Sequence, residues 1–373
     1  MPTADELLGP SVIANLTECL GGELPATSAA SKDFPGLSLS ARTRHVRDAL
    51  LADLPTTFPL FERRIRNASN NPAFTGWMIW PVTEALAVRA TSAGTTGAAG
   101  SAEFDAGLVL LADLTSRLTG EFALRTFMDS DLDRTLAAAL DWTAHPDPHV
   151  RRLASEGTRP FLPWGRRVAA LTARPDATAA ILESLYRDES DYVRRSVANH
   201  LNDLARTDPD LVVASARAFM AQPDANTPKL VRHALRTLIK KGHPDALALL
   251  GFAPPEGITV SDLLVTPQDV IAGTDMAFRF ELANTSGSTQ AVAVDYVVHH
   301  VRANGERSPK VFKLTHRTLA PGSRETVTRA HSFRPITTRR YYPGEHLIEI
   351  QVNGTVLADA VFRLSEATDT MTA

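Results

Sequence analysis

A six-residue pattern that recurs along the chain is the feature that most constrains its fold. Residues 147–152 (DPHVRR) are echoed by residues 190–195 (SDYVRR) and, more loosely, by residues 228–233 (PKLVRH), at offsets of 43 and 38 residues. Each copy opens a segment whose apolar residues follow the 3.6-residue helical period. One such helix cannot bury its apolar face alone, so we expect the copies to stack into a solenoid.

The spacing of the copies is typical of HEAT and armadillo repeats, in which each unit consists of packed helices. The same helical period runs through residues 1–253, which are therefore predicted to form one α-solenoid domain. Residues 90–101 (ATSAGTTGAAGS) are small and of low complexity, and we expect a loop between helices there. The predicted helices cover Leu39–Leu54 and the segments near 56–67, 77–89, 104–117, 120–129, 131–143, 147–158, 176–187, 190–206, 209–221 and 227–241.

The pattern changes to that of β-strands after Pro254-Pro255. Apolar and polar residues then alternate with a period of two, and pairs such as Asn-Gly and Pro-Gly separate the runs. Six or seven short strands are typical of an immunoglobulin-like β-sandwich, so residues 254–373 are predicted to form a second domain. The predicted strands lie near 276–282, 291–298, 310–314, 325–328, 346–352 and 360–364.

Charge and cysteine content exclude several classes of protein. The formal net charge is −3, so any contact with DNA requires a local basic patch rather than a uniformly basic surface. Residues 294–340 are such a patch, because ten Lys and Arg residues and four His residues accompany only three acids there. A chance basic face on a small domain is the alternative. The single cysteine, Cys19, cannot form an intrachain disulfide, which suits a reducing compartment.

No pattern indicates secretion, a membrane span or a cofactor. The N-terminal MPTADELLGP has acids where a signal peptide has basic residues, and the longest apolar runs are far shorter than the roughly 20 residues of a membrane helix. We therefore expect a cytoplasmic protein. The chain lacks a Walker A loop, a GxGxxG after a strand, an HExxH and zinc-finger spacing. His299 and His300 point to opposite faces of a predicted strand, so we expect neither a metal site nor a cofactor.

Residues 147–164 (DPHVRRLASEGTRPFLPW) place a cation, a carboxylate and an aromatic side chain near one helix end. Arg152 and Glu156 are four residues apart and share a helix face, and Trp164 follows the predicted end of that helix. These three residues are candidates for a functional site. The alternative is a surface ion pair with Trp164 in the core, and the residues alone favour it.

The second copy of the pattern presents a similar polar face. Arg195, Asn199 and Asp203 are spaced by four residues, opposite the apolar stripe of their helix. They are candidates for DNA contact, and Asp203 is a weaker candidate for catalysis. The alternative is a solvated face in which Asp203 pairs with Arg206 or caps a neighbouring helix.

A basic stripe and a single glutamate are further candidates, the stripe for contact with DNA and the glutamate for catalysis. Arg232, Arg236 and Lys240 lie on one line of the next helix, and such a stripe is suited to tracking phosphates. A solvated face is its more common meaning. Glu121 lies at the predicted start of the helix near 120–129, where its simplest role is to interact with the helix dipole.

Four segments resemble the DNA alkylation-repair glycosylases of the AlkC/AlkD type, and more closely the AlkC branch. They are residues 76–81 (GWMIWP), 120–125 (GEFALR), 150–164 (VRRLASEGTRPFLPW) and 192–203 (YVRRSVANHLND), of which the last two are long and specific. The AlkC branch includes members with an appended immunoglobulin-like domain, so the resemblance covers nearly the whole chain.

The resemblance implies a protein that binds double-stranded DNA and excises cationic lesions, N3-methyladenine and N3-methylcytosine, without deep base flipping. It implies that Glu156 is the principal catalytic carboxylate and that Glu121 is its partner. It further implies that Trp164 packs against the deoxyribose of the lesion, and that Arg152 holds a phosphate or orients Glu156. Asp203 would be a weaker contributor to the same pocket. A monomer is the simplest expectation for such an enzyme.

Three hypotheses about function therefore remain open. The first is a monofunctional DNA-alkylbase glycosylase in base excision repair. The second is a non-catalytic binder of DNA structures, and the third is a HEAT-type scaffold that binds proteins through its concave face. A scaffold does not need a cation, a carboxylate and an aromatic side chain together, and a non-catalytic binder does not need Glu121 and Glu156. The retained carboxylates favour the enzyme.

Overall fold

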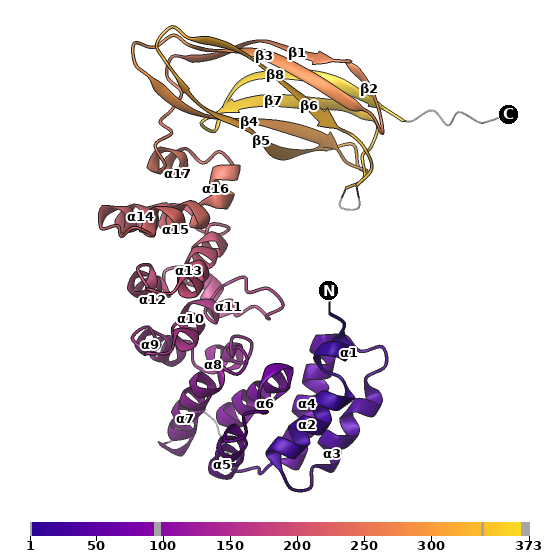
Figure 1. Cartoon of the computed structure of the whole chain (residues 1–373), viewed down its shortest axis with the longest axis vertical. Helices are drawn as coiled ribbons and strands as arrows, with labels where there is room; N and C mark the ends of the chain where they lie inside the picture. Colours follow the sequence, from indigo (N-terminus) through magenta and orange to yellow (C-terminus); the bar gives the residue numbers. More distant parts are fainter. Residues whose placement is uncertain (1, 93–97, 337–338, 367–373) are drawn as a thin grey trace, which may run out of the picture. The chain divides into compact units, whose positions relative to one another are not determined.

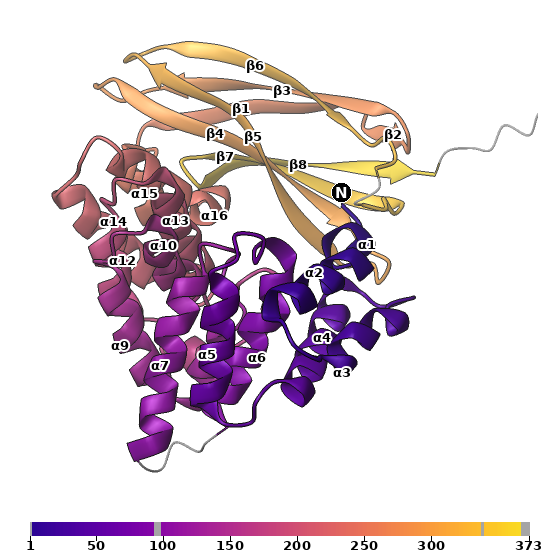
Figure 2. The ribbon, with the colours of Figure 1, turned by 60° about the horizontal axis from the view of Figure 1, so that its bottom comes forward.

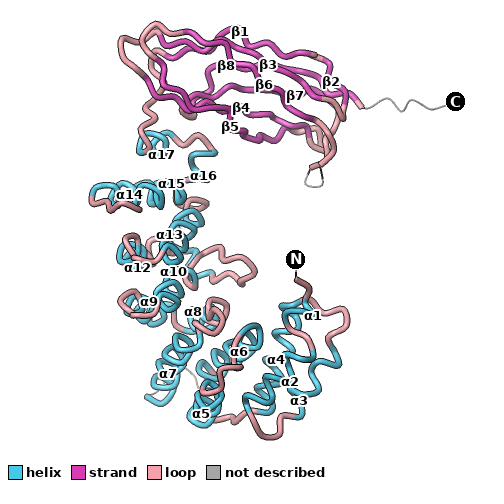
Figure 3. The backbone as a smooth tube through the Cα atoms, in the orientation of Figure 1, coloured by secondary structure: helices cyan, strands magenta, loops and turns pink. Residues whose placement is uncertain are grey.

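The computed structural model describes residues 2–92, 98–336 and 339–366 (Figure 1). The chain divides into two compact units, Met1–Ala234 and Leu235–Ala373. Helices form the first unit and strands dominate the second (Figure 3), which confirms the predicted order of fold classes. The short helices α16 (Arg236–Lys240) and α17 (Pro244–Leu249) belong to the second unit. The sequence change at Pro254-Pro255 marks where the strands begin.

The first unit is a stack of helices. From α9 onward, α9, α12 and α14 form one row, and α10, α13 and α15 form a second row beside it (Figures 1 and 2). No helix of the described residues is both long and apolar enough to cross a membrane. The helices are α1 (Ala4–Leu7), α2 (Pro10–Leu20), α3 (Pro25–Ala29), α4 (Leu39–Asp53), α5 (Phe58–Ser69), α6 (Ile79–Thr91), α7 (Ala98–Leu114), α8 (Leu124–Ser130), α9 (Leu132–Trp142), α10 (Pro148–Glu156), α11 (Ala169–Ala173), α12 (Ala179–Leu185), α13 (Asp191–Leu204), α14 (Pro209–Ala221) and α15 (Thr227–Ala234), with 3-10 turns at Ala30–Asp33 and Gly76–Met78.

The three copies of the sequence pattern start the three helices of the second row, as predicted. In α10 the Asp147 side chain accepts a hydrogen bond from the backbone N–H of His149 at 2.8 Å, and Pro148 occupies the first helical position. Helix α13 buries Val193 and Val197 and packs between α10 and α15. The apolar period thus determines which faces meet.

The first arginine of each Arg-Arg pair binds the loop that precedes α13. Arg151 donates to both carboxylate oxygens of Asp188, at 2.6 and 3.1 Å, in the loop before the next copy of the pattern. Arg194 donates to the carbonyls of Asp188 and Glu189 in the same loop. The second arginine of the first pair, Arg152, lies instead on the polar face of its helix.

Two predictions about the helices were wrong. Residues 98–101, expected in a loop, belong to α7, and residues 93–97 lie outside the described residues. The segment 227–241 is not one helix, because α15 ends at Ala234 and Leu235 leaves the helical conformation at φ −82° and ψ 0°. Arg232, Arg236 and Lys240 therefore do not line one helix.

The second unit is a β-sandwich of a three-stranded sheet, β1-β3-β6, and a five-stranded sheet, β2-β8-β7-β4-β5. The described residues form eight strands, of which β1 and β2 had not been predicted. Alternation within β3 buries Phe278 and Phe280 against Ile348 and Ile350 of the facing sheet. The strands are β1 (Ile258–Thr266), β2 (Asp269–Ile271), β3 (Asp275–Asn284), β4 (Gln290–Val301), β5 (Arg307–Leu319), β6 (Arg324–Ser332), β7 (Gly344–Val352) and β8 (Thr355–Ser365).

The basic patch at residues 294–340 is partly neutralised. Four of its ten basic side chains form ion pairs with carboxylates, and three of these partners lie outside the segment. Arg324, for example, contacts Glu281 at 2.7 Å because β6 lies beside β3. The positive excess counted along the sequence is therefore larger than the excess on the folded surface. The pairs are Arg307–Glu345, Arg317–Glu325, Arg324–Glu281 and Arg334–Asp275.

Three histidines lie in the apolar interior of the sandwich. His300, His331 and His346 are buried around Phe333, with ring centroids 4.9 to 6.0 Å from it. Burial, reinforced by the charge of Arg339, lowers the pKa of His300 to about 3 and that of His331 to about 4. Burial also lowers the pKa of His346. These rings are therefore neutral at neutral pH.

We expect acid to destabilise the sandwich. The unfolded chain binds protons at these histidines below their usual pKa of 6.5, whereas the folded chain does not. Their contribution to the free energy of unfolding is therefore complete above about pH 7 and is lost as pH falls toward 4. At pH 5 the loss is about 2 kcal/mol for each of His300 and His331. Calorimetry at pH 7.5 and 5.0 tests this. His300→Leu should shrink the difference in Tm between the two pH values. An unchanged difference would contradict the assigned role of the buried ring.

Candidate active site

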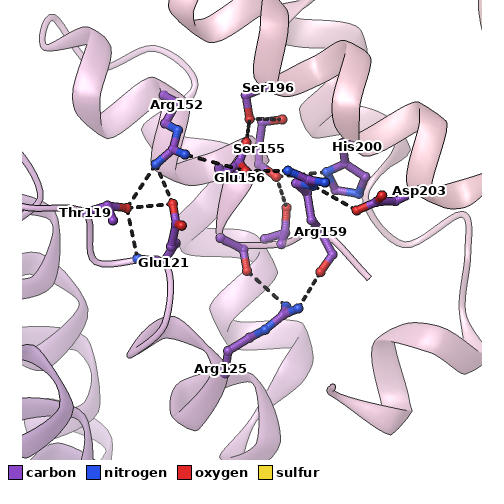
Figure 4. A network of polar contacts seen from close by, with 12 residues as sticks. Thr119, Glu121, Arg125, Arg152, Ser155, Glu156, Arg159, Ser196, His200 and Asp203 are labelled. Atoms are coloured by element: carbon purple, nitrogen blue, oxygen red, sulfur yellow. Dashed lines mark hydrogen bonds and ion pairs between the residues drawn. The ribbon is translucent and has the colours of Figure 1, made fainter. Parts of the chain in front are cut away.

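Glu156 is the last residue of α10, and its carboxylate is the centre of a buried polar network (Figure 4). Oε1 contacts Arg159 Nη1 at 2.5 Å and Arg152 Nη2 at 3.5 Å. Oε2 accepts a hydrogen bond from Ser196 Oγ of α13 at 2.7 Å. Only 6% of Glu156 is exposed. The Arg152–Glu156 pair forms as predicted, but it is not an ordinary surface pair.

Glu121 joins the network from the turn that precedes α8. Its Oε2 accepts hydrogen bonds from Arg152 Nη1 at 2.5 Å and from Thr119 Oγ1 at 2.8 Å. Helix α8 begins only at Leu124, so the prediction that Glu121 lies in the first turn of a helix was wrong. Arg152 therefore lies between two carboxylates, and its guanidinium also covers the ring of Tyr192 at 5.1 Å.

Asp203 joins the network from the far end of α13. Its Oδ2 accepts a hydrogen bond from Arg159 Nε at 2.8 Å, and only 2% of the residue is exposed. The alternative of a solvated Asp203 paired with Arg206 is therefore wrong. Arg159 bridges Asp203 and Glu156, which lie on neighbouring repeats (Figure 4).

Three carboxylates meet two guanidinium groups in this network, so the groups in direct contact carry a net charge of −1. Arg125 lies beneath them, 1% exposed, and donates to the carbonyls of Gly157 at 3.2 Å and Arg159 at 2.5 Å (Figure 4). Burial lowers the pKa of Arg125 to about 10, so it remains protonated at neutral pH. Burial lowers the pKa of His200 to about 4, and its neutral ring bonds to the carbonyl of Ser155. The cation beneath the network balances its excess negative charge.

Trp164 projects into solvent and lines a pocket together with Phe122, the neighbour of Glu121 in the chain. It is 76% exposed, and its backbone has a positive φ of 64°, which is uncommon for a non-glycine residue. The alternative of Trp164 as a core residue is therefore wrong. A large apolar ring held outward on a strained turn is unfavourable in water and is suited to contact with a ligand.

The remaining predicted DNA-contacting residues lie on α13, α15 and α16. Arg195 of α13 is exposed and pairs with Asp191 at 3.1 Å, whereas Asn199 is half-buried. Arg232 is exposed on α15 in the first unit, and Arg236 and Lys240 are exposed on α16 in the second. Their contact with DNA stays a prediction.

Several members of the network were not identified from the sequence. Arg159 follows Glu156 by three residues, and this helical spacing was a usable signal even though the helix ends at Glu156. Ser196 and Arg125 had no comparable signal, because their partners are 32 to 41 residues away. Thr119 lies two residues before Glu121, but its contact with Arg152 spans 33 residues. Such contacts depend on how the repeats stack.

Comparison with known proteins relates both parts of the chain to a repair family. Residues 113–238 match the family described as DNA alkylation repair enzyme. Residues 259–366 match the family described as the C-terminal Ig-like domain of the uncharacterised protein YhaZ. The first match contains the whole polar network, from Thr119 to Asp203.

Two relatives match most of the chain. The uncharacterized protein YhaZ of Bacillus subtilis is 36% identical over 326 residues, which are 87% of this chain and 87% of that protein. A solved structure of the Pseudomonas fluorescens alkylpurine DNA glycosylase AlkC, bound to DNA containing an abasic site analog, is 32% identical. Its TM-score is 0.78, with 98% of this chain and 100% of that chain covered. The chain therefore belongs to the AlkC-like branch of the DNA alkylation repair enzyme family, with a helical-repeat glycosylase fold followed by an Ig-like domain.

Proposed function

We propose that this protein is a monofunctional DNA glycosylase that hydrolyses the N-glycosidic bond of N3-methyladenine and N3-methylcytosine in double-stranded DNA. The observation that carries the proposal is the buried network of Glu121, Glu156 and Asp203 with two arginines, together with the exposed Trp164, which shares a pocket with Phe122. Membership of the alkylation repair family and the likeness to a DNA-bound alkylpurine glycosylase support it.

The chemistry suits a cationic base. Methylation at N3 makes the base a good leaving group, so its departure needs little help from a general acid. Positive charge then develops on the deoxyribose, and a nearby carboxylate stabilises it electrostatically and orients the attacking water. Glycoside hydrolases use paired carboxylates in a comparable way. Since the charge of the lesion supplies much of the selectivity, the base need not be enclosed as it is by flipping enzymes.

Arg152 has a specific place in this mechanism. In the free protein it pairs with Glu121 and contacts Glu156. A DNA phosphate is a strong competing partner for a guanidinium group. If Arg152 turns toward a phosphate, the two carboxylates lose a counter-ion, and the negative potential at the sugar increases. Binding of the substrate would thus free the negative charge of the two carboxylates, which stabilises the transition state of the reaction.

We expect Trp164→Ala to reduce the rate of excision by about tenfold while leaving the fold intact. The indole is largely exposed, so its removal costs little stability, and an aromatic face beside the sugar contributes about 0.5–2 kcal/mol of cation–π attraction. Single-turnover excision with Trp164→Ala and Trp164→Phe measures this. The Phe variant should keep most of the activity; equal loss in both would assign the effect to the backbone at this position.

The two other classes of function predict different behaviour. A scaffold that binds proteins would not bind abasic-site DNA, and a non-catalytic DNA binder would bind it without releasing a base. The buried carboxylates favour the enzyme over both, because keeping three acids out of water is costly and serves neither alternative.

The deciding experiment measures release of free base from duplexes that contain N3-methyladenine or N3-methylcytosine, without added metal or nucleotide. Release of either base by the intact protein is expected, with an alkali-labile abasic site left in an uncut strand. An uncut strand distinguishes monofunctional hydrolysis from strand cleavage by a lyase. Retained DNA binding without release of either base would contradict the proposal and favour the non-catalytic binder.

A further inference from the structure

A pocket next to Trp164 is not used by the mechanism above. It has a volume of about 310 Å³ and lies between α4, α6 and the loop that carries Trp164. Phe122, the neighbour of Glu121 in the chain, forms part of its wall. A ligand in this pocket would therefore lie beside the proposed catalytic site. The lining residues central to its chemistry are Arg44, Arg47, Trp80, Glu84, Phe122 and Arg166.

Three guanidinium groups face this pocket. Arg44 and Arg47 lie one turn apart on α4, and Arg166 follows Trp164 by two residues. Arg47 pairs with Asp48 at 2.7 Å, and Arg166 pairs with Asp129. Arg44 forms no ion pair with any residue that the structure describes. Among the described residues, no carboxylate therefore contacts the guanidinium group of Arg44.

Trp80 forms part of the apolar wall of the pocket. The residue is 5% exposed and its ring stacks on Phe122, with centroids 4.5 Å apart. Its side chain also interacts with the carboxyl of Glu84, one turn further along α6. These contacts hold the wall of the pocket in place beside the arginines.

Glu84 is the one carboxylate among the residues lining the pocket, and it does not neutralise the arginines by contact. It forms no ion pair within the described part of the chain. Burial raises the pKa of its carboxyl, and the side chain of Trp80, together with the charges of Arg47, Arg166 and Arg44, opposes that rise. In the free protein this carboxyl balances the arginines at a distance. The donors of the pocket outnumber its acceptors, which suits an anion rich in acceptor oxygens.

We propose that this pocket binds a phosphodiester of the damaged DNA strand, on a nucleotide flanking the lesion, through Arg44. The assignment rests on the proposed function for the identity of the ligand. Arginine side chains are among the groups that bind phosphate oxygens in protein–DNA interfaces. Such a contact would fix the position of the strand relative to Glu121 and Trp164 without reading its sequence.

The first test measures binding of a duplex with a tetrahydrofuran abasic-site analogue by fluorescence anisotropy across salt concentrations. Arg44→Ala should weaken binding by about tenfold and reduce the slope of log K against log salt by about one, as expected for one lost phosphate contact. Arg63→Ala removes an exposed arginine of α5 outside the pocket and should leave the slope unchanged. Equal slopes in both variants would overturn the proposal.

The second test replaces single phosphates of the damaged strand by neutral methylphosphonates. One position near the abasic site should weaken binding of the wild-type protein by about tenfold and have no effect on Arg44→Ala. If no single methylphosphonate position weakens binding more than the others, in the wild-type protein and in Arg44→Ala alike, the proposed phosphate contact in this pocket is overturned.

These outcomes separate the pocket from the catalytic proposal. A phosphate-specific defect in Arg44→Ala, without base release by the wild-type protein, would support the pocket and overturn the glycosylase activity. Normal excision with a uniform phosphate profile would do the reverse. A wild-type protein that fails to bind abasic-site DNA would overturn both.

Discussion

Replacing Glu156 by glutamine is expected to slow base excision by about 100- to 1000-fold, the usual cost of losing one electrostatic group that acts on the transition state. Glutamine keeps the size of the side chain and its hydrogen bond with Ser196, but it carries no charge. The positive charge that develops on the sugar would then lose the central carboxylate of the network. Single-turnover release of N3-methyladenine measures the effect.

Two controls make this result interpretable. Glu183→Gln removes an exposed carboxylate of α12 away from the network and should excise at the wild-type rate. Affinity of Glu156→Gln for an abasic-site duplex should stay within a few-fold of wild type, because the lost group acts on the transition state rather than on the DNA backbone. Unchanged excision by Glu156→Gln would sink the catalytic role of this residue.

The largest effect on stability is expected for Arg159→Ala, which should lower the free energy of unfolding by about 3–5 kcal/mol. Arg159 contacts Glu156 at 2.5 Å and Asp203 at 2.8 Å, and the side chains of all three are at most 8% exposed. Its removal leaves two buried carboxylates without their shared partner. Urea unfolding, followed by circular dichroism, measures the loss.

An exposed pair of similar geometry provides the matched control. Arg174 contacts Asp133 at 2.6 Å, but the two side chains are 50% and 76% exposed. Arg174→Ala should therefore cost less than about 1 kcal/mol. Adding Asp203→Asn to Arg159→Ala should recover part of the lost stability, since one unpaired buried charge is removed. A cost for Arg159→Ala no larger than that for Arg174→Ala would contradict the assigned role of burial.

Much of the fold was predictable from local patterns. The Val-Arg copies at 150–151 and 193–194 indicated stacked helices, and these helices lie side by side as α10 and α13. Alternation indicated the long strands of the sandwich, such as β3 and β7. Strands β1 and β2 were not predicted. In β1 the burial pattern is irregular and a bulge interrupts the pairing, and β2 has only three residues.

The candidate site was predictable only in part. Arg152 and Glu156 were found together because both lie on one helix, four residues apart. Arg159 and Asp203 are 44 residues apart, and no local pattern relates them. Trp164 was assigned to the core by the simpler interpretation, since an aromatic ring is usually buried, yet a turn with positive φ holds it in solvent.

The sequence by itself determined the class of each unit, the repeat that orders the helices and the faces that each helix buries. It could do so because apolar burial follows the short period of a helix or a strand. Only the tertiary structure decided which charged groups meet, that Glu156 and Asp203 share Arg159, and that Arg324 is neutralised by Glu281 on a neighbouring strand. Charges act through space, and only stacking and strand pairing bring residues distant in the chain within reach of one another.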